Sequence, residues 1–351
     1  KFFGSCSTEC MAFTVICHGE PLTLQLLHDG VELPKGSPLG ALTAAHERRL
    51  SRMTAAATAL VVLAAGVIVL WCCAGFQLGQ LVTLTVAGRS VLIYQPVAAR
   101  MQAHKRQVAA IFALKPSLGA PWWTREEDGF ESYADSLGFL VVYPNTAHGE
   151  NDQTWGFRDD LTYLAAVVQR LRQDDFGLDP SKVFVTGWSS GGSMALFLQN
   201  EVDLFNAAAS VEGAACRVQQ WSMDRRGHRT MLFWNHADPA MGDPGGDNAF
   251  YYNQTMSVLR RRASKTPSSV VPMPLSNHVA SAALEKYSSD GQPELLVISW
   301  STSASGLAAW EASPSTGFLD WPHQWPRSPP QTFSATRMIV DFFFNRSTLY
   351  S

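Results

Sequence analysis

The sequence has few cysteines, and they are unevenly placed. Of six cysteines in 351 residues, five precede residue 75 and the sixth is Cys216. A single cysteine excludes an intramolecular disulfide framework from the main part of the chain, and no CxxC pair or Cys/His spacing typical of zinc is present.

Charged residues are also scarce, at 16% of the sequence with a net charge of −3. No overall basic field therefore favours nucleic acid, and the sequence predicts no nucleic-acid partner.

One long stretch has no charge at all. Residues 55–76 read AAATALVVLAAGVIVLWCCAGF, which meets the length of about 20 apolar residues that a bilayer core requires. Three basic residues stand directly before it: Arg48, Arg49 and Arg52. The positive-inside tendency then keeps the N-terminus cytosolic and exports the chain beyond residue 76. We expect residues 54–76 to be a transmembrane signal-anchor or a signal peptide, with a buried core helix as the alternative. Residues 1–53 carry no pattern that we can interpret.

Residues 77–351 alternate between strand-like and helix-like segments. Strands are expected at 81–87, 90–95, 108–114, 139–143, 182–186, 207–211, 231–235 and 294–300. Helices are expected at 130–137, 159–171, 190–200, 250–262 and 334–344. Gly88-Arg89 between the first two strands indicates a hairpin. This alternation predicts an α/β fold with a mostly parallel sheet, an antiparallel N-terminal edge and helices on both faces.

A G-x-S-x-G pentapeptide lies between an expected strand and an expected helix. Gly187-Trp188-Ser189-Ser190-Gly191 directly follows the strand KVFVT, which is the strand–turn–helix context of a nucleophile elbow. The turn is so tight that both glycines are needed, and the start of the helix favours developing negative charge. The alternative is an ordinary Gly/Ser-rich loop. We interpret Ser189 as a nucleophile.

A serine nucleophile needs a base that is oriented by an acid, and in this architecture the chain order is Ser, Asp or Glu, then His. The strand 231–235 runs into Asp238, which becomes the predicted acid, with Asp243 and Asp247 as fallbacks in the same loop. The base should lie between the last strand and the last helix, where His323 stands. The remaining candidates fit this order less well: His148, His228, His236 and His278.

With these residues, the sequence resembles the polyhydroxybutyrate depolymerase and feruloyl esterase group of secreted α/β-hydrolases. The resemblance spans roughly residues 81–345 and rests on GWSSGGSMA, HADP and HQWP. LGFLVVYPN, LDPSKVFVTG and Trp155 followed by Asp159-Asp160 add to it. It implies an α/β-hydrolase fold and the triad Ser189, Asp238 and His323, in agreement with the order argued above.

Two features depart from that family. The third strand usually ends in His-Gly, and its loop supplies an oxyanion-hole N–H; here Lys115-Pro116 follows the strand. Proline has no N–H, so Ser117 becomes the expected donor beside the backbone of Ser190. Losing one donor can cost about 10²–10³ in rate. The second departure is the long stretch 301–320 before His323.

The sequence thus predicts a serine esterase that needs no metal and no cofactor. Trp188 and Trp325 are expected at the substrate, because each lies within two residues of a predicted triad member; Trp122, Trp123 and Trp155 are expected mainly in the core. The substrate would be a polyester or an acylated polysaccharide, and residues 55–76 would be the membrane partner. One alternative is a serine peptidase or lipase on the same fold, although the lack of a propeller-sized N-terminal region argues against a prolyl-oligopeptidase type. The other is a catalytically inactive binding module.

Overall fold

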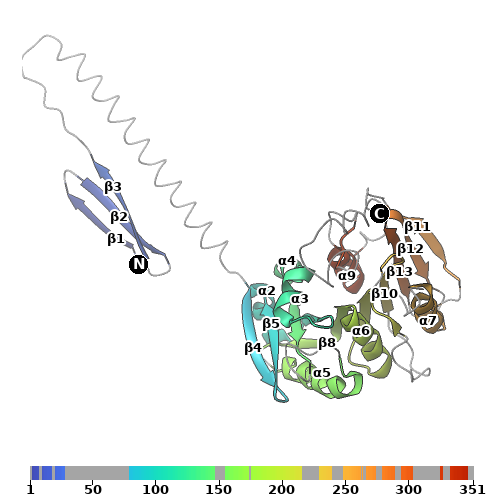
Figure 1. Ribbon diagram of the computed structural model, residues 1–351. Coiled ribbons are helices and arrows are strands. Elements are labelled where there is room, and N and C mark those ends of the chain that lie inside the picture. Colours follow the sequence, from blue (N-terminus) through green and yellow to red (C-terminus); the bar gives the residue numbers. More distant parts are fainter. Residues whose placement is uncertain are drawn as a thin grey trace, which may run out of the picture. The chain divides into compact units, whose positions relative to one another are not determined.

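The structure is a computed structural model, and the chain divides into two compact units, Lys1–Gly75 and Phe76–Ser351 (Figure 1). It describes residues 2–7, 10–17, 20–27, 79–146, 155–173, 175–215, 229–238, 248–261, 263, 266–273, 279–288, 294–302, 325–326 and 333–346. For the first three of these segments only the backbone is described.

The first unit contains a small antiparallel sheet that the sequence did not predict. Its strands β1 (Phe2–Ser7), β2 (Cys10–Cys17) and β3 (Glu20–Leu27) pair in chain order. The expected membrane segment, residues 54–76, lies outside the described residues. Among the helices that are described, none has both the length and the apolar character needed to cross a bilayer.

The second unit is built on a sheet that has ten strands in the described residues, in the order β11-β12-β13-β10-β9-β8-β6-β7-β5-β4. The strands are β4 (Gln80–Val86), β5 (Arg89–Gln95), β6 (Val108–Leu114), β7 (Leu140–Pro144), β8 (Leu178–Trp188), β9 (Ala207–Val211), β10 (Arg229–Asn235), β11 (Ser269–Pro272), β12 (Val279–Tyr287) and β13 (Leu295–Thr302). From β13 to β7 the neighbours pair in parallel. The α/β fold with a mostly parallel sheet is therefore confirmed.

The N-terminal edge of the sheet is the antiparallel hairpin that the sequence predicted. β4 pairs with β5, and β5 pairs antiparallel with β7. The turn falls on Ala87 and Gly88, one residue earlier than expected, and both residues have positive φ, 48° and 78°. Positive φ at both central residues is the type I′ geometry that matches the twist of a two-residue hairpin.

The opposite edge is also antiparallel, which the sequence did not predict. β11 and β12 extend the sheet beyond β13. In β12 only Val279, Leu284 and Tyr287 are buried, and their spacing of five and three residues does not follow the strand period of 2. β11 is exposed at every position. An edge strand that buries so little apolar surface leaves little signal in a single sequence.

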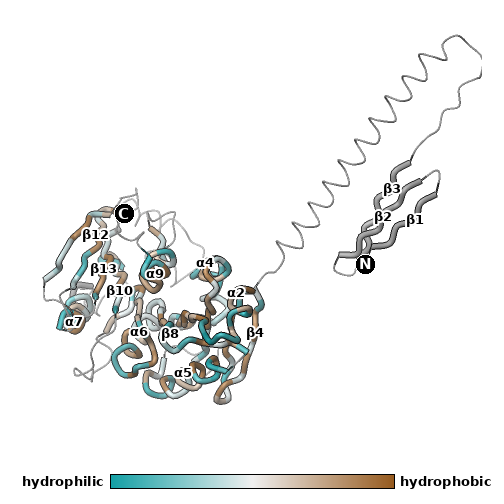
Figure 2. The backbone as a smooth tube through the Cα atoms, turned by 180° about the vertical axis from the view of Figure 1, so that it is seen from behind, coloured by the Kyte–Doolittle hydropathy of each residue, from teal (hydrophilic) through white to brown (hydrophobic). Residues whose placement is uncertain are grey.

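Helices cover both faces of the sheet (Figure 1). On one face lie α3 (Pro121–Asp128), α4 (Phe130–Leu137) and α9 (Ala335–Phe343). On the other lie α5 (Phe157–Leu171), α6 (Ser190–Glu201) and α7 (Asn248–Arg260). α2 (Val97–Gln102) and α3 are additional to the helices expected from the sequence. Figure 2 shows apolar and polar residues alternating along these helices, as expected when one side of each helix faces the sheet.

The sheet separates two apolar cores because successive strand residues point to opposite faces. In β6, Ile111 joins the core beneath α4 and α9, whereas Phe112 joins the core beneath α5 and α6. Every residue of β6 is buried. The run VAAIFAL therefore reads as a continuous apolar stretch, which is typical of a parallel strand covered on both faces.

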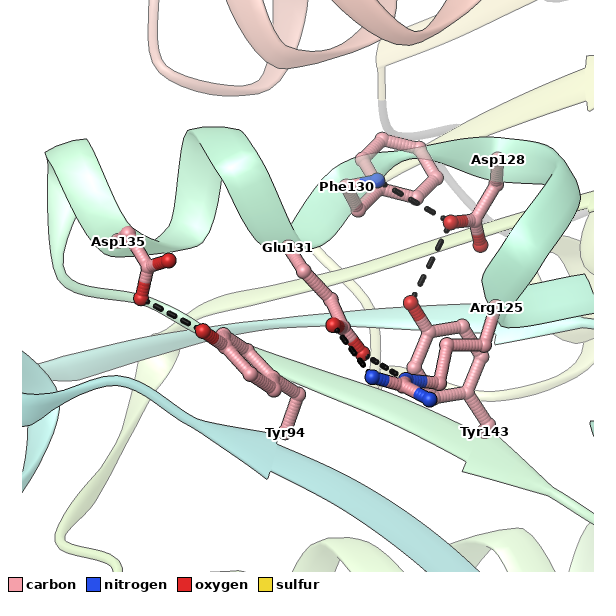
Figure 3. Close-up of polar contacts among 7 residues, drawn as sticks. All are labelled: Tyr94, Arg125, Asp128, Phe130, Glu131, Asp135 and Tyr143. Carbon is pink, nitrogen blue, oxygen red and sulfur yellow. Dashed lines mark hydrogen bonds and ion pairs between the residues drawn. The ribbon is translucent and has the colours of Figure 1, made fainter. Parts of the chain in front are cut away.

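Polar side chains tie α3 and α4 to the sheet (Figure 3). Asp128 Oδ1 accepts hydrogen bonds from the Phe130 N–H at 3.1 Å and from the Tyr143 hydroxyl at 3.3 Å. Arg125 and Glu131 form a two-point ion pair beside them. Burial, followed by the nearby Asp128 carboxylate, raises the pKa of Tyr143 well above its ordinary value.

Alkaline pH is expected to destabilise this unit. Burial also raises the pKa of Tyr163, to about 12. Above the unfolded-state pKa of about 10 the unfolded chain ionises these tyrosines first, so each one lowers the free energy of unfolding by about 1.4 kcal/mol per pH unit until its folded-state pKa is reached. Urea unfolding at pH 9 to 11.5 should show this fall, and a shallower fall in Tyr143→Phe. Equal pH slopes in the two proteins would contradict it.

Candidate active site

Ser189 lies in a sharp turn between β8 and α6. Its backbone has φ 54° and ψ −119°, a conformation that non-glycine residues adopt only when the surroundings enforce it. The Ser189 N–H donates to the carbonyl of Val211 at 2.8 Å, and the Ser189 carbonyl accepts from the Ser193 N–H at 3.0 Å. The side chain keeps partial solvent access. This is the geometry of a nucleophile elbow.

Both glycines of the pentapeptide are required by close backbone approach. A Cβ at Gly187 would lie 2.4 Å from the carbonyl carbon of Gly191. A Cβ at Gly191 would lie 2.3 Å from the carbonyl oxygen of Leu114 and 2.6 Å from that of Lys115. The first turn of α6 therefore packs directly against the end of β6, which brings Ser189 and the loop after β6 together.

The loop after β6 is a closed turn. The Gly119 N–H donates to the Pro116 carbonyl at 3.2 Å, which closes a turn in which Leu118 has φ 61°. Outside the described helices and strands, the backbone N–H of Ser117 donates to no backbone carbonyl among the described residues. Ser190 is the first residue of α6, where the helix dipole favours negative charge. The predicted donors Ser117 and Ser190 thus belong to two segments, the loop after β6 and the start of α6, that meet at the Gly191 backbone.

Asp238 is buried, with 1% of its surface exposed, three residues beyond the end of β10. Asn235 shapes this turn: its side-chain oxygen accepts from the Ala237 N–H at 3.0 Å, and its carbonyl accepts from the Asp238 N–H at 3.3 Å. β10 is the second strand from β8. The predicted acid therefore lies at the same sheet edge as Ser189, because both follow the carboxyl ends of parallel strands.

The predicted base and the fallback acids, His323, Asp243 and Asp247, lie outside the described residues. His236, the nearest alternative in sequence, packs edge-to-face on Tyr252 of α7 with the ring centroids 4.7 Å apart. Desolvation lowers the pKa of His236, and the Glu285 carboxylate acts in the opposite direction. Within the described residues, no group of three or more His, Cys, Asp or Glu side chains could hold a metal ion.

Trp188 and Trp325, which the sequence placed at the substrate, are both buried. Trp188 is 3% exposed, and its ring lies 5.5 Å from that of the half-buried Trp123. Trp325 is 4% exposed, packs edge-to-face on Phe130, and donates from Nε1 to Thr336 Oγ1 at 2.9 Å. Trp325 therefore contacts both α4 and α9.

Beside the strand end that carries Ser189, the structure places a buried carboxylate that the sequence did not indicate. Glu212 follows β9 directly, is 0% exposed and has φ 50°. Its Oε2 accepts a hydrogen bond from Trp188 Nε1 at 3.3 Å, and its N–H donates to the Phe233 carbonyl. Only the position directly after a strand could have pointed to it, because nothing in the local sequence signals burial or positive φ at a glutamate.

Comparisons with known proteins agree with this architecture. A family model described as the prolyl oligopeptidase family matches residues 130–271. An acetylxylan esterase of Coprinopsis cinerea is 32% identical over 154 residues, which is 39% of each chain. Feruloyl esterase B of Thermothelomyces thermophilus is 33% identical over 116 residues, covering 30% of this chain and 39% of that protein. The chain thus spans about two fifths of the length of these curated relatives.

Among solved structures, an acetyl xylan esterase from Aspergillus awamori aligns with a TM-score of 0.47 and 16% identity, covering 63% of this chain and 93% of that one. Over the matched residues the sequence is therefore similar to acetylxylan and feruloyl esterases, and the sheet order and the turn at Ser189 are those of an α/β-hydrolase fold.

Proposed function

We propose that this chain is a serine esterase that hydrolyses carboxylic esters through an acyl-enzyme on Ser189. The observation that carries the proposal is the strained backbone of Ser189, φ 54° and ψ −119°, at the junction of β8 and α6. Strain of this kind costs about 1–3 kcal/mol and persists mainly where a site uses it. The similarity to acetylxylan and feruloyl esterases supports the same reaction.

In the proposed reaction, Ser189 Oγ attacks the ester carbonyl while its proton passes to His323. The N–H groups of Ser117 and Ser190 stabilise the oxyanion of the tetrahedral intermediate. Collapse expels the alcohol, which takes the proton from His323, and leaves the acyl group on Ser189. Water then attacks the acyl-enzyme, gives a proton to His323, and the acid is released as Ser189 regains its proton. Asp238 stabilises the imidazolium in both steps.

For the substrate we propose an acylated polysaccharide, with polyhydroxyalkanoate-type esters as the alternative. The relatives that support this are named for acetylxylan and feruloyl esters. We further propose that residues 55–76 take the catalytic domain out of the cytosol, as a signal peptide or an uncleaved anchor.

A serine peptidase is the second candidate, because the prolyl oligopeptidase family model matches residues 130–271. The two activities share the nucleophile and differ in the leaving group, which is an alcohol for an ester and an amine for a peptide. Rates on matched ester and anilide substrates that carry one acyl group separate them.

Labelling with a fluorophosphonate probe tests the nucleophile. We expect the wild-type chain to be labelled and Ser189→Ala to be unlabelled, because the probe reacts only with an activated serine. A substrate panel then follows: p-nitrophenyl acetate to octanoate, methyl ferulate, acetylated xylan, hydroxybutyrate oligomers and p-nitroanilides. No labelling of wild type would overturn the esterase and favour an inactive binding module. Faster turnover of anilides than of esters would favour the peptidase.

A further inference from the structure

The loop that is proposed to bind the oxyanion begins at Lys115, and its first peptide bond is unusual. Because Pro116 has no N–H, the Lys115–Pro116 peptide can be held by a hydrogen bond only through the Lys115 carbonyl. That carbonyl accepts a hydrogen bond from Trp155 Nε1 at 2.8 Å. Trp155 is 3% exposed, so water does not readily replace this bond.

The same carbonyl lies against the nucleophile elbow. A Cβ on Gly191 would approach the Lys115 oxygen to 2.6 Å, so the oxygen occupies a fixed place between the Trp155 indole and the first turn of α6. Two residues further on is the Ser117 N–H, a proposed oxyanion donor. A displacement of the Lys115 carbonyl would therefore move that donor relative to Ser190.

The backbone next to Trp155 is held by a partly buried ion pair. The next residue, Gly156, donates its N–H to Asp160 Oδ2 at 2.7 Å. Asp160 is 0% exposed and pairs with Arg89 from the β4–β5 hairpin. The Arg89 guanidinium also lies 4.7 Å from the centre of the Tyr163 ring. Three well-separated segments, the hairpin, the start of α5 and the loop after β6, are thus joined by one chain of polar contacts.

From this geometry we propose that Trp155 is a positioning residue for the oxyanion hole: its indole N–H holds the Lys115 carbonyl and thereby sets the place of the Ser117 N–H. The proposal rests on the esterase function proposed above. It assigns to Trp155 a role in transition-state stabilisation rather than in core packing alone. A donor that serves only the oxyanion acts in the transition state, so its displacement should lower kcat and leave KM nearly unchanged.

The test replaces Trp155 in the full chain with 3-benzothienylalanine, which keeps the ring shape and removes the N–H, and with phenylalanine. We expect kcat to fall by about 10–100-fold, less than the 10²–10³ for complete loss of a donor, with KM within about twofold. The affinity for a trifluoromethyl ketone, which forms the oxyanion adduct, should fall by the same factor as kcat/KM.

Trp234→Phe is the matched control. Trp234 is buried like Trp155, at 0% exposed, and its Nε1 has no hydrogen-bond partner in the described part of the chain, so its replacement removes volume without a hydrogen bond. An equal fall of kcat in the control and in the Trp155 variants would overturn the proposal. So would a raised KM at unchanged kcat, or unchanged affinity for the ketone.

Amide hydrogen exchange of residues 114–119 separates this proposal from the proposed function. We expect faster exchange at Gly119, whose N–H closes the Pro116 turn, in the benzothienylalanine variant but not in the control. This readout needs no activity. If wild type is unreactive toward fluorophosphonate, the esterase fails by that measurement, whereas unchanged exchange overturns the holding role of Trp155.

Discussion

Replacing Ser189 by glycine is expected to abolish ester hydrolysis and to raise the free energy of unfolding. Loss of the nucleophile should lower kcat by about 10⁶. The backbone at φ 54° and ψ −119° strains any residue with a Cβ, at about 1–3 kcal/mol, and glycine removes that strain. Glycine also has greater conformational freedom in the unfolded state, which offsets about 0.5–1 kcal/mol of that relief. The free energy of unfolding should therefore rise by about 1 kcal/mol.

Ser189→Ala is the control that separates strain from activity. Alanine removes the hydroxyl and keeps the Cβ, so this variant should be as inactive as the glycine variant without its gain in stability. Thermal unfolding of the three proteins measures the difference, because about 1 kcal/mol corresponds to roughly 2–4 °C in Tm for a domain of this size. A glycine variant no more stable than the alanine variant would mean that the elbow stores no strain.

Much of the parallel sheet could be predicted from the sequence because its strands are buried on both faces. Such strands form short runs such as VAAIFAL and MLFW, and the residues between them carry the helical period. The elbow was equally clear, since a close approach such as that of Gly191 to the Lys115 carbonyl admits only glycine. These features are local, and their physical cause lies within a few residues of the signal.

Other features depend on contacts between distant residues and leave no local signal. Trp155 and the Lys115 carbonyl are 40 residues apart, and the sequence predicted only a core tryptophan at position 155. The hydrogen bond from Trp325 to Thr336 of α9 joins two side chains 11 residues apart, and no local pattern in the sequence indicated it; the place of Trp325 at the substrate stays a prediction. β12 was missed because its neighbour β13 supplies the pairing that its own mixed composition does not favour.

Within the predicted site, the structure brings Ser189, Ser190 and the Ser117 loop together and buries Asp238 at the same edge of the sheet. Topology explains this arrangement, because the carboxyl ends of parallel strands meet at one edge. The same topology places a second carboxylate at this edge of the sheet. Glu212 follows β9, which lies between the strand of Ser189 and the strand of Asp238, so the choice of the acid calls for a direct test.

Asp238→Asn is expected to lower kcat by about 10⁴, because an amide in place of the carboxylate favours the wrong tautomer of the base and does not stabilise the imidazolium. Loss of the negative charge should also lower the apparent pKa of the base in the kcat/KM profile.

Glu212→Gln is the matched comparison at the neighbouring strand. Glutamine keeps an oxygen that can accept from Trp188 Nε1, the bond that Glu212 Oε2 makes at 3.3 Å. We expect kcat of this variant to stay within about tenfold of wild type, as for a changed hydrogen bond outside the reacting atoms.

The two variants give opposite patterns if the assignment is reversed. A loss near 10⁴ in Glu212→Gln, with a small effect in Asp238→Asn, would make the carboxylate after β9 the acid. Comparable losses in both would mean that the base is oriented by two carboxylates. The double variant then decides, because residues that act as one unit show little further loss when combined, whereas independent contributions multiply. Asp238 is favoured because Asn235 fixes its turn through both the side chain and the backbone, whereas the Glu212 carboxylate is engaged with an indole in the apolar core.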